Sequence, residues 1–396
     1  MPKRKIRQPQ VLRDYLNNLT IEDLRKLGRH LPVNIPTRKE EIVDVIYRGM
    51  MEGDGLQRLW TRLDQLQRSA VAEVVHSAAN HFDGAAFRAK YGSDPHWGTT
   101  PKGLLSIREP SALALFFYNR EMPADLKTAL QAFVPKPRAV EMKMVDTLPE
   151  QVALTSPRWQ RRPPTDEPLV ELTVRETQWM AQQDLLAVLR LVEAGQVCVT
   201  AKTQRPTVTT QRAIGEILFD GDFYPPPASE KAKDYFAPTE PDYMRAFAWP
   251  LLLQSANLAE VAGAKLQLTS AGKKALTAPP HQTLRAIWQS WLKSTLLDEF
   301  NRVKTIKGQT GQGADAMTAP SGRRKVIAGA LPNLPVNGWV AFDEFSRYMQ
   351  AVGHTFTVSR DLWTLYIEEA NYGSLGYEGF GDWHIVQARY LLVFLI

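Results

Sequence analysis

Apolar residues recur at helical spacing through most of the chain, and the clearest example lies just before Gly195. Leu185, Leu189 and Val192 fall on one face of a predicted helix, which Gly195 can end by adopting a left-handed conformation. A short β-branched run at 197–199 then predicts a strand. The period of the pattern therefore changes from helix to strand at this point.

The pattern continues with two more helices and a hairpin. The second helix is expected to be capped by Thr209 or Thr210. Its buried stripe is predicted to consist of Ala213, Ile214, Ile217 and Leu218. A third helix is predicted at 243–253, and the alternating segment that follows it predicts a hairpin that turns at Gly263.

The order helix, strand, helix, helix, hairpin, helix resembles a winged helix. The phrase LQLTSAGKKAL at 266–276, in which Thr269 or Ser270 caps the last helix, resembles the wing strand and exit helix of many winged-helix DNA-binding proteins. The resemblance implies that the N-terminal part of the second helix approaches the major groove. The residues expected to contact DNA in this region are Lys202, Arg205, Gln211, Arg212, Lys265, Lys273 and Lys274. The alternative is a small helical scaffold that touches only protein.

Residues 1–50 carry a separate set of helix signals. Thr20 and Thr37 each begin a capping pattern, and an apolar stripe follows each of them. The two short helices and the extended loop in LTIEDLRKLGRHLPVNIPTRKEEIVDVIY resemble a SAP-type motif, a family that binds double-stranded DNA largely through its backbone. The resemblance implies phosphate contacts by Arg25, Lys26, Arg38 and Lys39. The alternative is a solvated charged face on a helical hairpin.

Breaks in the pattern divide the chain into several predicted domains, and the fold class is mainly α with small β-hairpins. We expect a SAP-like hairpin at 1–50, a helical domain at 51–134, a proline-rich linker at 135–168, a winged-helix domain at 169–280 and a helical region with a second winged-helix-like domain at 281–396. Within the last region a helix is predicted at 283–300. The polar, glycine-rich segment 307–322 is predicted to be a mobile loop. Five cations flank this segment and could close on DNA or belong to an ordinary flexible insertion: Lys304, Lys307, Arg323, Arg324 and Lys325.

The sequence ends on an apolar run, ARYLLVFLI, that has no polar cap. Natural termini are usually polar and frayed, so a strand or helix of this composition is expected to be buried. Two interpretations stay open: the run is a central core strand, or the sequence is a fragment of a longer protein. We favour the second.

The composition is that of a globular protein, with 44% hydrophobic and 23% charged residues. The net charge of +6 permits a polyanionic partner without requiring one. The single cysteine, Cys198, excludes an internal disulfide framework. The basic N-terminus lacks the apolar segment of a secretory signal, and no apolar run has the length of a membrane span. We therefore expect a cytoplasmic protein that does not enter the membrane.

No motif in the sequence indicates catalysis. The phosphate-binding pattern GxxxxGK[ST] is absent, as are the nucleophile elbow, HExxH and paired-cysteine zinc patterns. We therefore predict no catalytic residues, no metal site and no cofactor. An uncharacterised enzyme whose site is assembled from distant residues is one alternative.

A larger resemblance extends from about residue 180 to the end. LQLTSAGKKAL followed by LRAIWQSWLKS and the aromatic tail resembles bacterial helicase-associated winged-helix proteins related to the N-terminal region of XPB-type helicases. The resemblance implies a non-catalytic accessory protein that binds duplex DNA with little sequence preference. It also implies a separate helicase or translocase chain as partner, in genome defence or repair. The other alternative is a protein–protein adaptor whose winged helices carry protein contacts.

Overall fold

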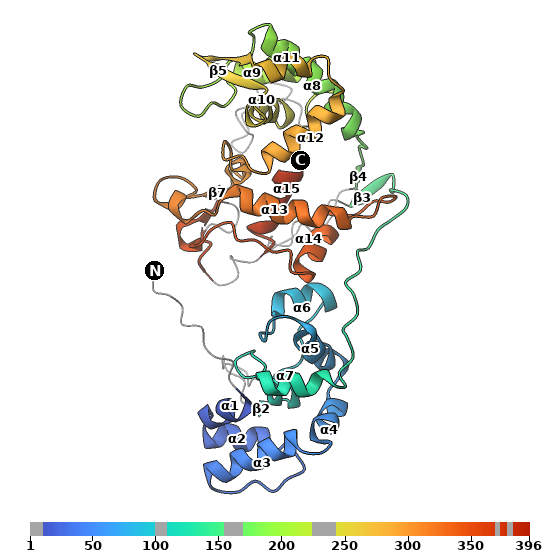
Figure 1. The fold of residues 1–396 in the computed structure, drawn as a ribbon, viewed down its shortest axis with the longest axis vertical. Coiled ribbons are helices and arrows are strands. Elements are labelled where there is room, and N and C mark those ends of the chain that lie inside the picture. Colours follow the sequence, from blue (N-terminus) through green and yellow to red (C-terminus); the bar gives the residue numbers. More distant parts are fainter. Residues whose placement is uncertain (1–10, 100–108, 154–168, 224–242, 369–372, 378–382) are drawn as a thin grey trace. The chain divides into compact units, whose positions relative to one another are not determined.

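The computed structural model describes residues 11–99, 109–153, 169–223, 243–368, 373–377 and 383–396. These residues are mainly helical with short antiparallel strand pairs, which confirms the predicted fold class at that level. The chain forms two compact units, and Figure 1 shows their elements. Unit 1 comprises Met1–Lys143 with Asp343–Gly353, and unit 2 comprises Met144–Phe342 with His354–Ile396.

Unit 1 consists of short helices and one small strand pair. Its elements are α1 (Leu12–Asn18), α2 (Ile21–Gly28), α3 (Lys39–Met51), α4 (Gly55–Arg62), α5 (Gln65–His76), α6 (Gly84–Tyr91), β1 (Gly98–Thr99), β2 (Glu109–Pro110), the 3-10 helix η1 (Ala112–Leu115), α7 (Ala124–Gln131) and nearly all of α14 (Phe342–Ala351). One hydrophobic core extends from Leu12 to Val134. Residues 1–50 and 51–134, predicted as two domains, share this core.

The caps of α2 and α3 differ in how well the sequence predicted them. Thr20 accepts a hydrogen bond from the backbone N–H of Asp23 at 3.1 Å, so its predicted role as the cap of α2 is confirmed. The predicted cap at Thr37 is wrong, because Arg38 is still extended and α3 begins at Lys39. The Arg38 side chain makes no capping hydrogen bond.

Polar contacts attach α14 to the rest of unit 1. Arg347 donates from Nη1 to the carbonyl of Ala89 at 2.8 Å and from Nη2 to the carbonyl of Glu141 at 2.7 Å. Glu344 pairs with Arg347 at 2.6 Å and accepts the backbone N–H of Lys143 at 2.7 Å. The hydrogen bond from Arg347 lowers the pKa of the Glu344 carboxyl group. A helix distant in sequence therefore belongs to the N-terminal unit.

Unit 2 contains three groups of antiparallel strands and the remaining helices. Its elements are β3 (Gln151–Ala153), β4 (Leu169–Glu171), α8 (Thr177–Glu193), α9 (Val208–Ile217), α10 (Arg245–Ser255), β5 (Ala259–Ala262), β6 (Lys265–Leu268), α11 (Ser270–Ala275), α12 (Pro280–Trp291), η2 (Glu299–Arg302), β7 (Ile306–Lys307), η3 (Gly311–Ala316), α13 (Pro320–Ala330), η4 (Leu331–Asn333), η5 (Leu362–Thr364), β8 (Tyr366–Ile367), β9 (Gly373–Ser374) and α15 (Gln387–Leu395). The strands pair as β3–β4, β5–β6 and β7–β8–β9.

Two buried arginines of α13 hold together the elements around η2. Arg324 pairs with Glu299 at 2.7 Å and also donates to the carbonyl of Leu297 at 2.6 Å. Arg323 pairs with Asp298. Because Arg323 and Arg324 are 1% and 0% exposed, these two cannot act as DNA-binding cations beside the loop. The other three flanking cations, Lys304, Lys307 and Lys325, are exposed. The segment 307–322 itself contains η3 and the first turn of α13.

Two predictions about the C-terminal region also need correction. The helix expected at 283–300 ends at Trp291, because the Arg324 guanidinium takes the carbonyls of Trp291 and Ser294 at 2.5 and 2.7 Å. The final apolar run forms α15, which is buried on one side only. Tyr390 is fully buried, whereas Leu392 is 41% exposed.

Candidate nucleic-acid interface

The predicted DNA-binding region of unit 2 has a small three-stranded arrangement at its centre. The backbone N–H of Val199 donates to the carbonyl of Ala264 at 2.9 Å, and that of Leu266 donates to the carbonyl of Val197 at 2.9 Å. Cys198 therefore lies opposite Lys265, and residues 197–199 run antiparallel to β6. β5 pairs with β6 along its other edge.

A threonine joins this arrangement to α9. The hydroxyl of Thr210 accepts the backbone N–H of Cys198 and donates to its carbonyl, both at 2.9 Å. Thr210 is therefore buried, and Thr207 caps α9 by accepting the N–H of Thr210 at 3.2 Å. The prediction of Thr209 or Thr210 as the cap is wrong, because the helix begins earlier, directly after Pro206 and Thr207.

The buried stripe of α9 is narrower than predicted. Ile214 and Leu218 are buried, whereas Ala213 is half-buried and Ile217 is 39% exposed. Because Thr210 takes the inward position one turn before Ile214, the face of α9 that meets the core is rotated away from Ile217. Thr209, Arg212 and Glu216 are exposed, as expected.

The structure explains the threonine and the glycine of the LQLTSAGKKAL segment at 266–276. Thr269 caps α11 by accepting the N–H of Gly272 at 3.1 Å and donates to the carbonyl of Asn257 at 2.7 Å. A Cβ on Gly272 would lie 2.0 Å from the carbonyl oxygen of Leu258, so only glycine fits. Lys273 and Lys274 project from this anchored helix and are exposed.

A buried ion pair fixes the helices behind this face. Asp184 of α8 is 1% exposed and accepts from the guanidinium of Arg245 at the start of α10. The indole N–H of Trp249 donates to the same carboxylate at 3.3 Å. The other carboxylate oxygen accepts the backbone N–H of Phe219, after α9, at 2.9 Å. Three helices are therefore tied to one buried carboxylate.

The predicted DNA-contacting residues of unit 2 differ in accessibility. Five of the cations are exposed, and none of them pairs with an acidic side chain in the described ranges: Lys202, Arg212, Lys265, Lys273 and Lys274. Gln211 is half-buried and donates to the carbonyl of Pro206 at 3.1 Å. Arg205 is half-buried, and its Nε is a buried donor with no partner in the described structure. The exposed acids Glu216 and Glu260 lie on α9 and β5 and reduce the local positive field.

α10 is covered by its own chain. Phe247 and Leu251 of α10 form a buried cluster with Trp291 and Leu297, and the guanidinium of Arg302 lies 4.2 Å from the centre of the Phe247 ring. In a helix-turn-helix, the second helix of the pair enters the major groove. The sequence resemblance gives this role to α9, on which Thr209 and Arg212 are exposed. α10, the helix that follows α9, has no free face to offer.

In the N-terminal hairpin of unit 1, most of the predicted phosphate contacts already have partners. Lys26 pairs with Glu22 at 2.7 Å, and the ammonium of Lys39 donates to the carbonyl of Asn17 at 2.7 Å, at the end of α1. Arg38 lies 3.9 Å from Glu41. Arg25 is exposed and has no ion pair with any other described residue.

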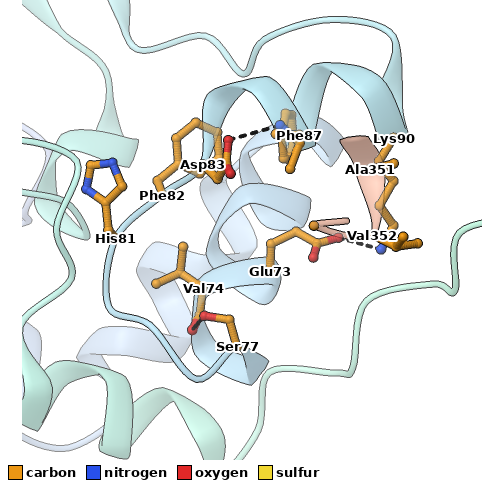
Figure 2. Close-up of a pocket in the computed structure, with 12 residues that line it drawn as sticks. Glu73, Val74, Ser77, His81, Phe82, Asp83, Phe87, Lys90, Ala351 and Val352 are labelled. Atoms are coloured by element: carbon orange, nitrogen blue, oxygen red, sulfur yellow. Dashed lines mark hydrogen bonds and ion pairs between the residues drawn. The ribbon is translucent and has the colours of Figure 1, made fainter. Parts of the chain in front are cut away.

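A cavity of about 210 Å³ in unit 1 is lined by residues of α5, α6 and the end of α14, and Figure 2 shows its polar side chains. Glu73 pairs with Lys90 at 2.6 Å and accepts the hydroxyl of Tyr91 at 2.8 Å. Asp83 accepts two backbone N–H groups of α6 as its cap. Both carboxylates therefore stabilise local structure.

The described part of the chain contains neither a cluster of metal ligands nor a membrane-spanning helix. No group of three or more His, Cys, Asp or Glu side chains there could hold a metal ion. None of its helices is both long enough and apolar enough to span a bilayer.

Comparison with known proteins assigns no family to the chain. No family model matches it, and neither a curated protein nor a solved structure does.

Proposed function

We propose that the chain is an accessory protein that binds duplex DNA with little sequence preference through the exposed cations of unit 2. The observation that carries the proposal is the set Lys202, Arg212, Lys265, Lys273 and Lys274, all exposed and without an acidic partner in the described ranges. Unpaired lysine and arginine side chains are the groups that neutralise phosphates and release counterions.

The surrounding structure supports contact with phosphates more than recognition of bases. α10 is covered, and Gln211, the predicted side chain best suited to a base edge, already donates to Pro206. With few cations and two nearby acids, we expect a Kd on the order of 10⁻⁶ to 10⁻⁴ M at physiological salt, the range of non-specific binding. A sequence-tolerant contact of this strength suits a subunit that works with another DNA-binding chain.

The winged-helix interpretation is part of the proposal. The order α8, the bridged segment 197–199, α9, α10, β5–β6 and α11 follows the order that the sequence resemblance implies, although the segment 197–199 forms isolated bridges and no regular strand. The helicase-associated resemblance adds a separate helicase or translocase as partner, in genome defence or repair. The second winged helix at 281–396 is proposed from the sequence pattern. Trp339, within this range, forms a bridge with Val145, which lies outside it.

The test is fluorescence anisotropy with a labelled duplex over a series of salt concentrations. Arg212→Glu combined with Lys265→Glu should weaken binding at least about tenfold and lower the slope of log K against log salt by about two units. Neither side chain is buried, so circular dichroism and thermal unfolding should match the parent.

Arg285→Glu combined with Lys293→Glu is the matched control, because both residues are exposed cations of unit 2 and the change in charge is the same. The control should retain parental affinity. A parent that does not bind at low salt, or a folded Arg212/Lys265 variant that binds as tightly as the parent, would refute the proposal. An equal loss in both variants would show that net charge, and not this face, controls binding.

A protein adaptor is the second candidate function, and the end of α9 favours it. Phe219 is 47% exposed, while its backbone N–H donates to Asp184 and its carbonyl accepts from Arg245 at 3.1 Å. A rigidly held, exposed aromatic residue next to the exposed Ile217 is typical of a protein contact. Failure of the parent to bind any duplex at low salt would make the adaptor the better proposal.

A further inference from the structure

A second cavity of unit 1 has the size of a ligand-binding site. It has a volume of about 540 Å³ and lies between α2, the end of α1 and the turn at 118–121. Pockets for small ligands in proteins usually enclose about 300 to 1,000 Å³. None of the DNA-contacting residues proposed in unit 2 belongs to it, so the cavity calls for its own explanation.

Aromatic rings form much of its wall. Tyr15 and Tyr118 stack with ring centroids 5.3 Å apart and planes 22° apart. Trp97 and Phe117 meet edge to face at 5.4 Å. All four side chains line the cavity. Aromatic faces attract cations through their quadrupole as well as apolar groups through burial.

The charged groups at the cavity are predominantly acidic. Asp23 and Glu121 both line it, and the only lysine among its described lining residues, Lys26, is neutralised by Glu22 at 2.7 Å. Glu121 accepts the hydroxyl of Tyr15 at 2.7 Å, and a carboxylate can accept further donors. An anionic ligand would therefore be repelled, whereas a cation would find both carboxylates and aromatic rings.

The turn that carries Glu121 is a tight two-residue hairpin turn closed by Tyr118 and Glu121. Asn119 and Arg120 have φ values of 51° and 64°, in the left-handed region that non-glycine residues seldom adopt. Tyr118 and Glu121 exchange backbone hydrogen bonds at 2.8 and 2.9 Å across the turn. A two-residue hairpin turn of type I′ requires positive φ at both central residues, so the hairpin itself explains this conformation. The turn places Glu121 at the cavity.

We propose that this cavity binds an organic cation with an aromatic or aliphatic body. The ammonium or guanidinium group would lie between Asp23 and Glu121, and its body would pack on the aromatic rings of Tyr15, Trp97 and Tyr118. The cation has two conceivable sources, a free amine or the lysine side chain of another protein. This proposal is independent of DNA binding.

The test uses the whole chain and three probes of stated charge. Tyramine and N-acetyl-lysine amide are the cationic probes, and 3-(4-hydroxyphenyl)propanoate is the anionic control. Calorimetry and saturation-transfer NMR should show binding of at least one cationic probe and none of the anionic probe. Tighter binding of tyramine would indicate a free amine as the source, and tighter binding of the lysine amide would indicate a protein side chain.

Carboxylate variants locate the site. Glu121→Gln keeps an acceptor for the Tyr15 hydroxyl but should weaken binding of the cationic probe about tenfold. Asp23→Asn is the second variant and should weaken binding of the same probe. Glu40→Gln is the matched control, because Glu40 is an exposed carboxylate of α3 outside the cavity, and it should bind like the parent. The proposal is overturned if neither cationic probe binds at millimolar concentration, if the anionic probe binds equally well, or if both folded cavity variants bind like the parent.

Discussion

At the scale of single residues, two buried tyrosines differ in whether the hydroxyl group has a hydrogen-bond partner. Tyr390 donates to Glu299 at 3.0 Å. The hydroxyl of Tyr118 has no hydrogen-bond partner among the described residues. A buried hydroxyl without a partner loses its hydration and gains no hydrogen bond in return, whereas a hydrogen bond to a charged group is among the stronger stabilising contacts.

Replacing each tyrosine by phenylalanine should therefore have effects of opposite sign. Tyr118→Phe is expected to raise the free energy of unfolding by about 1 kcal/mol, because only an unsatisfied group is removed. Tyr390→Phe is expected to lower it by about 2 kcal/mol, because Glu299 loses a donor. Urea unfolding at pH 7 measures both. Equal destabilisation by the two variants would contradict the assignment of partners.

The same pair predicts how stability depends on pH. Burial raises the pKa of both phenols, with Asp125 adding to the effect at Tyr118 and Glu299 at Tyr390. In the unfolded chain a tyrosine ionises near its ordinary pKa of about 10. Above about pH 10 the unfolded chain therefore loses phenol protons that the folded chain retains. The free energy of unfolding contains the full contribution of these phenols below about pH 10, and this contribution is lost as the pH rises further. The alkaline decline should be shallower in Tyr118→Phe than in the parent.

The sequence shows which residues are charged, but it did not predict which of them are free to contact a partner. Arg25 and Lys202 are exposed as expected, but Lys39 is bonded to the carbonyl of Asn17 and Arg324 is buried with Glu299. The partners of Lys39 and Arg324 come from other elements of the chain. A charge pattern read along one helix carries no information about them.

At the scale of elements, the docking of α11 depends on one glycine. The N–H of Gly272 is held by the Thr269 cap, and its Cα lies against the carbonyl of Leu258, where β5 is about to begin. That oxygen is part of the backbone, so it cannot move aside as a flexible side chain could. The position of Lys273 and Lys274 relative to the hairpin depends on this contact.

Gly272→Ala should therefore lower the free energy of unfolding by roughly 2 to 3 kcal/mol, because the added methyl group collides with backbone. Gly322→Ala in α13 is the matched control, since nothing lies within 4 Å of its added Cβ, and it should be neutral or stabilising by roughly 0.5 kcal/mol. Thermal and urea unfolding of both variants are the measurements. A neutral Gly272→Ala variant would show that α11 does not dock in this way.

At the scale of the whole molecule, the proposed partnership with a motor makes a biochemical prediction. The sequence contains no GxxxxGK[ST] pattern, so the chain lacks the lysine and hydroxyl that hold ATP phosphates and magnesium in a phosphate-binding loop. Phosphate release by the purified chain should stay at background with or without duplex DNA. Turnover that survives purification and disappears on a point mutation of this chain would contradict the accessory role.

Local patterns located several helices of this protein. Apolar spacing located α2, α8 and α9, and the caps at Thr20 and Thr269 are where the sequence placed them. These features depend on neighbours within one or two turns, which a single sequence displays directly.

Tertiary structure alone decided which side chains remain available. Residues remote in sequence bury Arg323 beside Asp298, cover α10 with Trp291 and Leu297, and bring α14 into unit 1. The cavity between Asp23 and Glu121 likewise joins two segments that share no pattern. Contacts between distant segments form because they bury apolar surface and satisfy polar groups, and neither requirement leaves a periodic signal along the chain.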